Sequence, residues 1–298
     1  MQTQHSRQLL ALNLGTLLLS TSGILGKLIT LSASHTILLR CAIAFTVLFA
    51  LNWFTRYNQR VNWLRHGRFF VASGVLLAFH WVSYFYAIHI STVAVAFISL
   101  FTFPVMTTLL EPLFFKTRLS WRSLANAGLV FSGIVLLVPA FDLQTSLTAG
   151  ALAGLGSALL FALRNLMNKQ YIGIYPARTM MTWQLLVAGL VLLPSLLLQP
   201  LQLSAGNAGY LLLLGVVTTA AGQTLFVNSF KHFATSTASI ITSAQPVYGI
   251  ALAVIFTGEE LNWRTLAGGA VILGSVVFEN LRQYLPGNQR RGKVRSRR

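Results

Sequence analysis

The chain has 298 residues, of which 55% are hydrophobic and only 9% are charged, and its mean hydropathy is +0.67. A soluble domain of ordinary composition has about 25% charged residues, so these values exclude a soluble globular protein. The formal net charge of +17 would suggest a nucleic-acid partner in a soluble chain. Here the basic residues lie between long apolar runs, and we expect no such partner.

The apolar runs predict an all-α polytopic membrane protein with ten transmembrane helices. Each run is roughly 18–24 residues long, enough to cross a hydrocarbon core of ~30 Å as a helix. The first run is longer than the apolar part of a signal peptide, so we expect it to be retained. In chain order, the expected helices are 8–30, 34–54, 69–90, 92–115, 122–139, 148–171, 178–198, 207–229, 235–257 and 264–284.

The direction of the helices follows from lysine and arginine, which favour the cytoplasmic side of a membrane. With the N-terminus inside, 19 of the 22 basic residues lie in the expected cytoplasmic segments, and only Lys27, Arg40 and Arg264 do not. The sequence therefore predicts a protein of the cell (inner) membrane with both termini in the cytoplasm. The basic segment 286–298 is expected to be a disordered tail that contacts anionic lipid headgroups.

A phrase in residues 115–125 recurs in residues 257–267. An internal copy near half the chain length indicates a duplicated unit. Since each copy would contain five helices, the second copy enters the membrane in the inverted orientation. We expect one unit at 1–142 and an inverted one at 143–285, with a substrate site near the membrane midplane. The offset of 142 residues relates Trp121 to Trp263, Arg122 to Arg264, Pro104 to Pro246 and Lys27 to Lys169.

Two five-helix units, each with a proline-bearing helix, a Leu-Ser/Asn-Trp-Arg phrase and a Gly-rich last helix, resemble the drug/metabolite transporter superfamily and its ten-helix EamA-type members. The Gly258-Glu259 phrase of the second half is replaced in the first half by residues 116–118. The resemblance implies a secondary transporter that exports a small metabolite, such as an amino acid, by alternating access. The segments that carry it are Ser22–Lys27, Leu39–Ala44, His80–Ala87, Phe103-Pro104, Gln245-Pro246 and Phe256–Leu261.

Two other functions stay open at this point. A multidrug or toxic-compound efflux permease fits the same architecture. A membrane-embedded enzyme would have to use Ser157 and the histidines of the third helix. The sequence has no Walker-type phosphate loop and no His-Glu-x-x-His motif, so we expect no catalytic residues, no metal and no cofactor.

Polar and aromatic side chains at membrane depth predict the substrate cavity, because such groups are costly in lipid and usually face a cavity or a partner. Arg40 has two interpretations: it extends to the outer interface, or it attracts a substrate carboxylate or phosphate. Arg164 and Lys169 are interpreted as anchors at the cytoplasmic side. The candidates for the cavity are Arg40, His80, Trp81, Tyr84, Ser99, Phe103, Asn165, Gln223 and Gln245.

Pro104 and Pro246 are expected near the middle of the fourth and ninth helices, where a proline removes one backbone hydrogen bond. Their equivalent positions predict a pair of hinges that line the cavity. The membrane centre has few acidic residues, so Na⁺ coupling through carboxylates is not expected. The candidates for proton coupling are His80, Glu111 and Glu279.

Overall fold

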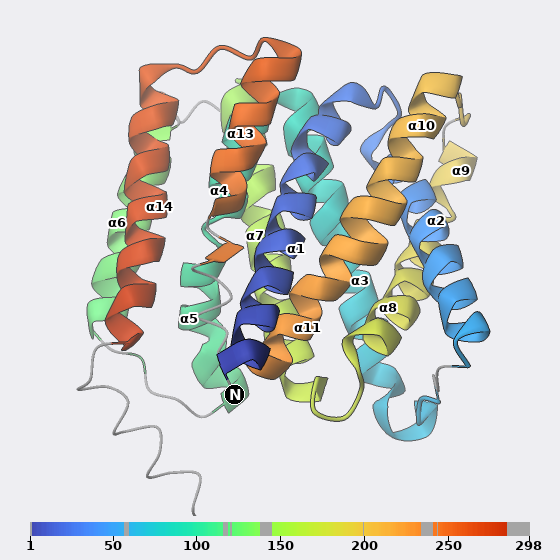
Figure 1. Ribbon diagram of the computed structural model, residues 1–298. Coiled ribbons are helices and arrows are strands. Elements are labelled where there is room, and N and C mark those ends of the chain that lie inside the picture. The colour runs from blue at the N-terminus through green and yellow to red at the C-terminus, as the bar shows by residue number, and fades with distance from the viewer. Residues whose placement is uncertain are drawn as a thin grey trace, which may run out of the picture.

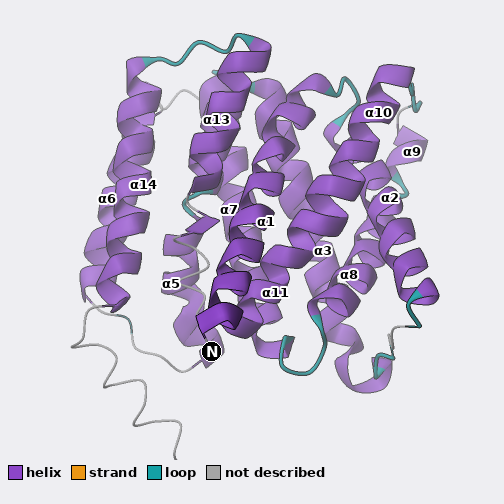
Figure 2. Cartoon of the chain, viewed as in Figure 1, coloured by secondary structure: helices purple, strands orange, loops and turns teal. Residues whose placement is uncertain are grey.

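The structure is a computed structural model that describes residues 2–56, 60–115, 119, 121–137, 145–198, 200–233, 241–242 and 244–284. Within these ranges all regular structure is helical, and the helices stand side by side in one bundle (Figures 1 and 2). The expected tail at 286–298 lies outside the described residues. The elements are α1 (Gln2–Leu28), α2 (Ala33–Phe54), α3 (Trp63–Ile90), α4 (Val93–Leu100), α5 (Phe103–Phe115), α6 (Trp121–Leu137), α7 (Ser146–Tyr171), α8 (Ala177–Leu192), α9 (Ser195–Leu198), α10 (Ala205–Leu213), the π-helix η1 (Leu214–Gln223), α11 (Thr224–His232), α13 (Ala244–Thr257) and α14 (Trp263–Tyr284).

Seven helical segments in the described part of the chain are long and apolar enough to cross a membrane. Two further apolar helices, Ser123–Leu137 and Ala244–Thr257, are shorter. The seven segments are Arg7–Leu28, Ala33–Phe54, Trp63–Ile90, Val93–Phe115, Ser146–Tyr171, Ala177–Leu198 and Ala205–His232.

Several helices begin at a side chain that accepts a hydrogen bond from the first turn, as N-cap residues do. At α3 the side-chain Oδ1 of Asn62 accepts from the backbone N–H of Arg65 at 3.0 Å. This cap starts the helix six residues before the expected position 69. Arg65 and Arg68, which were expected in a loop, therefore lie on α3. The other caps of this kind are Ser32 of α2, Thr92 of α4, Thr145 of α7 and Ser204 of α10.

The expected fourth helix is broken rather than bent. α4 ends at Leu100, and α5 begins at Phe103. Pro104 is therefore the second residue of a new helix, where its missing N–H costs nothing, and not a residue in the middle of one. Pro246 likewise lies in the first turn of α13. A third proline, Pro112, lies inside α5 and was not singled out from the sequence.

The expected eighth helix contains ten residues of π-helix, η1, between α10 and α11. In this segment the hydroxyl of Thr219 donates to the carbonyl oxygen of Leu214, five residues earlier, at 2.8 Å. The stretch of α3 that lies 142 residues before η1 is α-helical. π-Segments are rare and frequently occur at functional sites, and this one packs against both α1 and α2.

The turn between α3 and α4 is held from both sides. Lys27, in the last turn of α1, donates to the carbonyl oxygens of Ile88 and Ser91 at 3.3 and 3.2 Å. The carboxylate of Glu259 accepts the backbone N–H groups of the first two residues of α4, each at 3.0 Å. A cation at a helix C-terminus and an anion at a helix N-terminus both complement the helix dipole.

Lys169 repeats the contacts of Lys27 in the second half of the chain. It donates to the carbonyl oxygens of Phe230 and Phe233, at the end of α11, at 2.8 and 3.4 Å. Its two acceptors lie 142 residues after the two acceptors of Lys27. Lys169 is therefore a helix cap, in addition to being a basic residue near a helix end.

Replacing Lys27 with methionine is expected to lower the free energy of unfolding by about 1.5–3 kcal/mol, because hydrogen bonds from a charged group are lost and carbonyls stay unpaired. Thermal unfolding of the purified protein in detergent measures the effect. Lys231→Met is the matched control, because Lys231 is exposed on α11. Equal melting temperatures for the two variants would contradict the capping role.

The helices α6 and α14 pack against each other in antiparallel orientation. Gly268 approaches the backbone of Leu137, and Gly133 approaches Ile272, so the residue numbers run in opposite directions along the contact. A Cβ on Gly268 would lie 2.7 Å from the carbonyl oxygen of Gly133, so glycine is what permits this close approach. Because each helix begins at a copy of the repeated Trp-Arg phrase, the two copies lie at opposite ends of the bundle.

Candidate functional site

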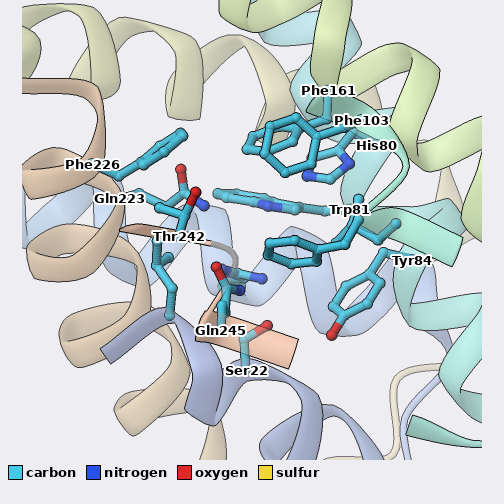
Figure 3. A pocket seen from close by; sticks show the side chains of 14 residues that line it. Ser22, His80, Trp81, Tyr84, Phe103, Phe161, Gln223, Phe226, Thr242 and Gln245 are labelled. Atoms are coloured by element: carbon cyan, nitrogen blue, oxygen red, sulfur yellow. The ribbon is translucent and has the colours of Figure 1, made fainter. Parts of the chain in front are cut away.

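A small cavity lies where the middle parts of the helices meet (Figure 3). Its free volume is about 30 Å³, which is room for about two water molecules and therefore not for an amino acid. The side chains that line it come from α1 to α5, α7, η1, α11 and α13 and from the segments between them. They are Leu19, Ser22, Arg40, His80, Trp81, Tyr84, Leu100, Phe101, Phe103, Phe161, Gln223, Phe226, Thr242 and Gln245.

The lining follows the internal repeat. Ten of the fourteen residues form pairs that are 142 positions apart. The two members of a pair often differ in chemistry, so the cavity is symmetric in position and asymmetric in polarity. The pairs are Leu19 with Phe161, Trp81 with Gln223, Tyr84 with Phe226, Leu100 with Thr242, and Phe103 with Gln245.

Arg40 places a positive charge at the cavity. Its side chain is only 1% exposed, and its guanidinium carbon lies 3.9 Å from the centroid of the Trp81 ring, a cation–π geometry. Nε donates to Oγ1 of Thr219 on η1 at 2.6 Å. The guanidinium therefore does not extend to the interface, as one of its two interpretations required. It lies inside the bundle, between α3 and η1.

The charge of Arg40 has no counter-ion among the described residues. Nη1 is buried and has no hydrogen-bond partner, and no described carboxylate contacts the guanidinium. An unpaired buried charge costs several kcal/mol, and a free N–H donor adds to that cost. An anionic oxygen in the cavity would satisfy both the charge and the donor.

His80 ties α3 to α7 through Ser157. The hydroxyl of Ser157 donates to the carbonyl oxygen of His80 at 2.8 Å. Its only proton is then used, so Nδ1 of His80 must be the donor to the Ser157 hydroxyl at 2.7 Å and to the Ser157 carbonyl at 3.0 Å. In the neutral ring this leaves the lone pair on Nε2, and the hydrogen bonds of His80 to described residues are made by Nδ1.

Aromatic rings form one wall of the cavity. The ring of Phe161 stacks on His80 at 4.5 Å between centroids. It meets Phe103 edge-on at 4.8 Å and stacks with Phe226 at 5.9 Å. Figure 3 shows these rings grouped on the side of the cavity away from Ser22. This wall would take the apolar part of a ligand.

The comparison with known sequences decides the family. The model of the EamA-like transporter family matches residues 7–138 and matches again at residues 148–281. The chain belongs to the EamA-like transporter family. The resemblance to drug/metabolite transporters is therefore confirmed, and the chain is an integral membrane protein of a transporter family.

Individual relatives agree with this family. An uncharacterized transporter, YxxF, of Bacillus subtilis (strain 168) is 26% identical over 218 residues, which cover 72% of this chain and 70% of the relative. An uncharacterized transporter of Archaeoglobus fulgidus is 29% identical over 200 residues, covering 66% and 70%. A solved crystal structure superposes with a TM-score of 0.69 over 93% of this chain and 97% of its own, at 17% identity, which shows a shared fold.

In this EamA-like protein, seven of the nine expected cavity residues line the cavity, and two lie elsewhere. Ser99 is buried on the face of α4 that packs against Gly154 of α7. Asn165 is buried and does not line the cavity, and its Oδ1 has no hydrogen-bond partner among the described residues. Glu111 is half-buried on α5 and does not line the cavity. The side chain of Glu279 lies outside the described residues.

Half of the lining residues were not among those predicted from the sequence. Phe226 could have been found by adding 142 to Tyr84, which was already a candidate. Phe161 and Leu19 give no such signal, because an apolar residue in a transmembrane helix does not reveal which face it occupies. The full set of missed residues is Leu19, Ser22, Leu100, Phe101, Phe161, Phe226 and Thr242.

Proposed function

We propose that this EamA-like protein is a secondary transporter that exports a small organic molecule with a carboxylate and an apolar part, such as an amino acid. The observation that carries this proposal is Arg40, a buried guanidinium with an unpartnered Nη1 beside a cavity with aromatic walls. A substrate carboxylate would supply the missing charge and acceptor. The aromatic wall would bury the apolar part of the substrate.

The proposed mechanism is alternating access between two inverted five-helix halves, 1–142 and 143–285, with both termini in the cytoplasm. The pairing of cavity residues by the repeat offset supports a site on the axis between the halves. The cavity is too small for a metabolite, so the halves must move apart to admit one. The helix starts at Pro104 and Pro246 are the proposed hinges. Ten crossings require α6, α13 and α14 to cross as well.

Proton coupling is part of the proposal. His80 is a candidate because its Nε2 makes no hydrogen bond to a described residue and its ring lines the cavity. Glu111 is the other candidate whose side chain is described, and Glu279 remains a sequence-based one. A proton ionophore added to energised cells is expected to abolish net export.

Competition between matched compounds tests the substrate class. Purified protein in proteoliposomes is given a panel of labelled amino acids, with free carboxylates and the corresponding primary amides as competitors. If Arg40 binds the carboxylate, the carboxylates are expected to compete and the neutral-ended amides are not. Equal competition by both members of each pair would overturn the carboxylate assignment.

A multidrug permease is the alternative within the same family. Aromatic rings can bind organic cations, but the buried Arg40 repels them, and no described acidic side chain lines the cavity. Tetraphenylphosphonium is therefore expected neither to be transported nor to compete. Saturable efflux of this cation would favour the alternative.

A membrane-embedded enzyme would use the Ser157–His80 contact, since 2.7 Å is within reach for a nucleophile and its base. The hydroxyl proton, however, is directed to a backbone carbonyl, and no described carboxylate orients the imidazole. Ser157→Ala is expected to change flux by no more than about threefold, because the Ser157 carbonyl still accepts from His80. Covalent labelling of Ser157 by a fluorophosphonate would contradict the structural role of Ser157 and favour the enzyme.

A further inference from the structure

A second buried arginine lies outside the cavity. Arg164 of α7 is 0% exposed, so it is not the interfacial anchor that the sequence suggested. Its Nε and Nη2 donate to Oε1 of Gln184 on α8 at 3.0 and 2.7 Å, and Nη2 also contacts the sulfur of Met181 at 3.0 Å. Gln184 in turn donates to Oδ1 of Asn168 at 2.8 Å. These four side chains are called the Arg164 cluster.

The Arg164 cluster has more donors than acceptors. Nη1 of Arg164 and Nδ2 of Asn168 are both buried, and neither has a hydrogen-bond partner in the part of the chain that the structure describes. Both are N–H donors, so the missing partner is an acceptor. No described carboxylate contacts the guanidinium. A buried positive charge with free donors fits an anionic oxygen, by the same reasoning as for Arg40.

The cluster lies next to the cavity along α7. Ser157, Phe161 and Arg164 are spaced i, i+4 and i+7, so they share one face of the helix. Ser157 contacts His80, and Phe161 lines the cavity. Arg164 is therefore the next side chain on the cavity-facing stripe, one turn beyond the aromatic wall.

The two buried arginines lie at similar depths from opposite ends of the bundle. Arg40 is seven residues from the start of α2, and Arg164 is seven residues from the end of α7, about 10 Å in each case. α2 starts at the end of the bundle opposite the N-terminus marked in Figure 1. α7 also starts there, because Gly150 approaches Ser91 after α3, so it ends on the N-terminal side.

The repeat offset relates the two sites to each other. It maps Ser22, which lines the cavity beside Arg40, onto Arg164. It maps Arg40 onto Thr182 of α8, which lies between two members of the Arg164 cluster in sequence. Each half of the chain therefore has one arginine and one hydroxyl at these two positions, with the arginine on a different helix in each half.

We propose that the Arg164 cluster is a second anion-binding station, which holds the substrate carboxylate between the central cavity and the N-terminal side of the bundle. Movement of Phe161 and its aromatic neighbours connects the two stations. This inference rests on the proposed function, since it assigns a second site to the same substrate group. Arg164 then binds the substrate on its route through the bundle, in addition to holding α7 to α8.

Charge-selective modification of an introduced thiol tests the station without measuring transport. The full-length protein carries Cys41→Ala, which removes its single cysteine, and Asn168→Cys. The thiol is treated with an anionic methanethiosulfonate (sulfonatoethyl) or a cationic one (trimethylammonioethyl). Each rate is divided by the rate of that reagent with free mercaptoethanol. We expect a relative preference for the anionic reagent of about tenfold or more, which one charge a few Å away can produce.

The preference is expected to disappear in Arg164→Gln and to persist in Arg164→Lys. An unreactive thiol, an absent preference, or a preference that survives Arg164→Gln would each overturn the station and leave Arg164 as a structural contact. If Arg164→Gln fails to fold, Arg164→Met replaces it, since an unbranched apolar side chain fits beside Met181. Asn165→Cys provides a second reporter position one turn closer to the cavity.

Ser22→Cys in the same background, with and without Arg40→Gln, separates this inference from the proposed function. Anion preference at Ser22→Cys alone supports the Arg40 site and rejects the second station. Preference at Asn168→Cys alone supports the station and rejects the Arg40 assignment. Preference at both positions, each lost with its own arginine, is the result that supports both.

Discussion

Arg40→Lys is expected to lower transport of carboxylate substrates by about a hundredfold, although the charge is kept. Lysine has no Nε donor for Thr219 and no planar group to stack on Trp81, and it cannot form the forked contact of a guanidinium with a carboxylate. The loss of about 2.7 kcal/mol that this factor represents is within the range for hydrogen bonds to charged groups. Initial flux rates in proteoliposomes, at equal amounts of inserted protein, measure the effect.

Arg65→Lys is the matched control for this substitution, because Arg65 is exposed on α3. The flux of the Arg65→Lys protein is expected to stay unchanged. Discrimination between a carboxylate and its amide should also fall in Arg40→Lys, which a purely structural effect would leave intact. Unchanged flux and unchanged discrimination would show that the substrate does not contact the guanidinium.

Trp81→Ala is expected to abolish most transport and to lower the free energy of unfolding by about 3–5 kcal/mol, the usual cost of removing a buried tryptophan. The Trp81 ring supports Arg40 at 3.9 Å, so its removal leaves the guanidinium without its cation–π contact and leaves a void in the cavity wall. Trp81→Phe keeps an aromatic face and is expected to retain a large part of the flux.

Trp53→Ala is the matched control, because it makes the same tryptophan-to-alanine change at a side chain that is 73% exposed on α2. This variant is expected to change neither the flux nor the melting temperature. Thermal unfolding and flux are measured on the same preparations. If Trp81→Phe is as inactive as Trp81→Ala while both remain folded, the indole acts through its N–H or its size and not through its π face.

The repeat is the part of the sequence that predicts most of the architecture. Trp121 and Trp263 begin antiparallel helices at opposite ends of the bundle, as an inverted copy requires. The same offset pairs Phe103 with Gln245 across the cavity. Such positions are predictable because a duplicated chain places equivalent residues at equivalent depths.

The inward face of each helix was not predictable in the same way. Membrane helices are apolar toward lipid and apolar toward each other, so hydrophobic periodicity carries little information about orientation. Ser99 is polar and at the right depth, yet it faces Gly154 and not the cavity. The π-helix η1 has no sequence signature either, and it presents Thr219 to Arg40.

The sequence by itself determined that the chain is a membrane protein with an internal repeat, because apolar length and the repeated phrase are properties of the chain read in order. Only the tertiary structure decided which basic residues lie inside. Arg40 is held by Thr219, 179 residues away, and Arg164 by Gln184 on the next helix. An arginine near a helix end can extend to the interface or turn inward, and the choice depends on partners that only the packed bundle brings within hydrogen-bonding distance.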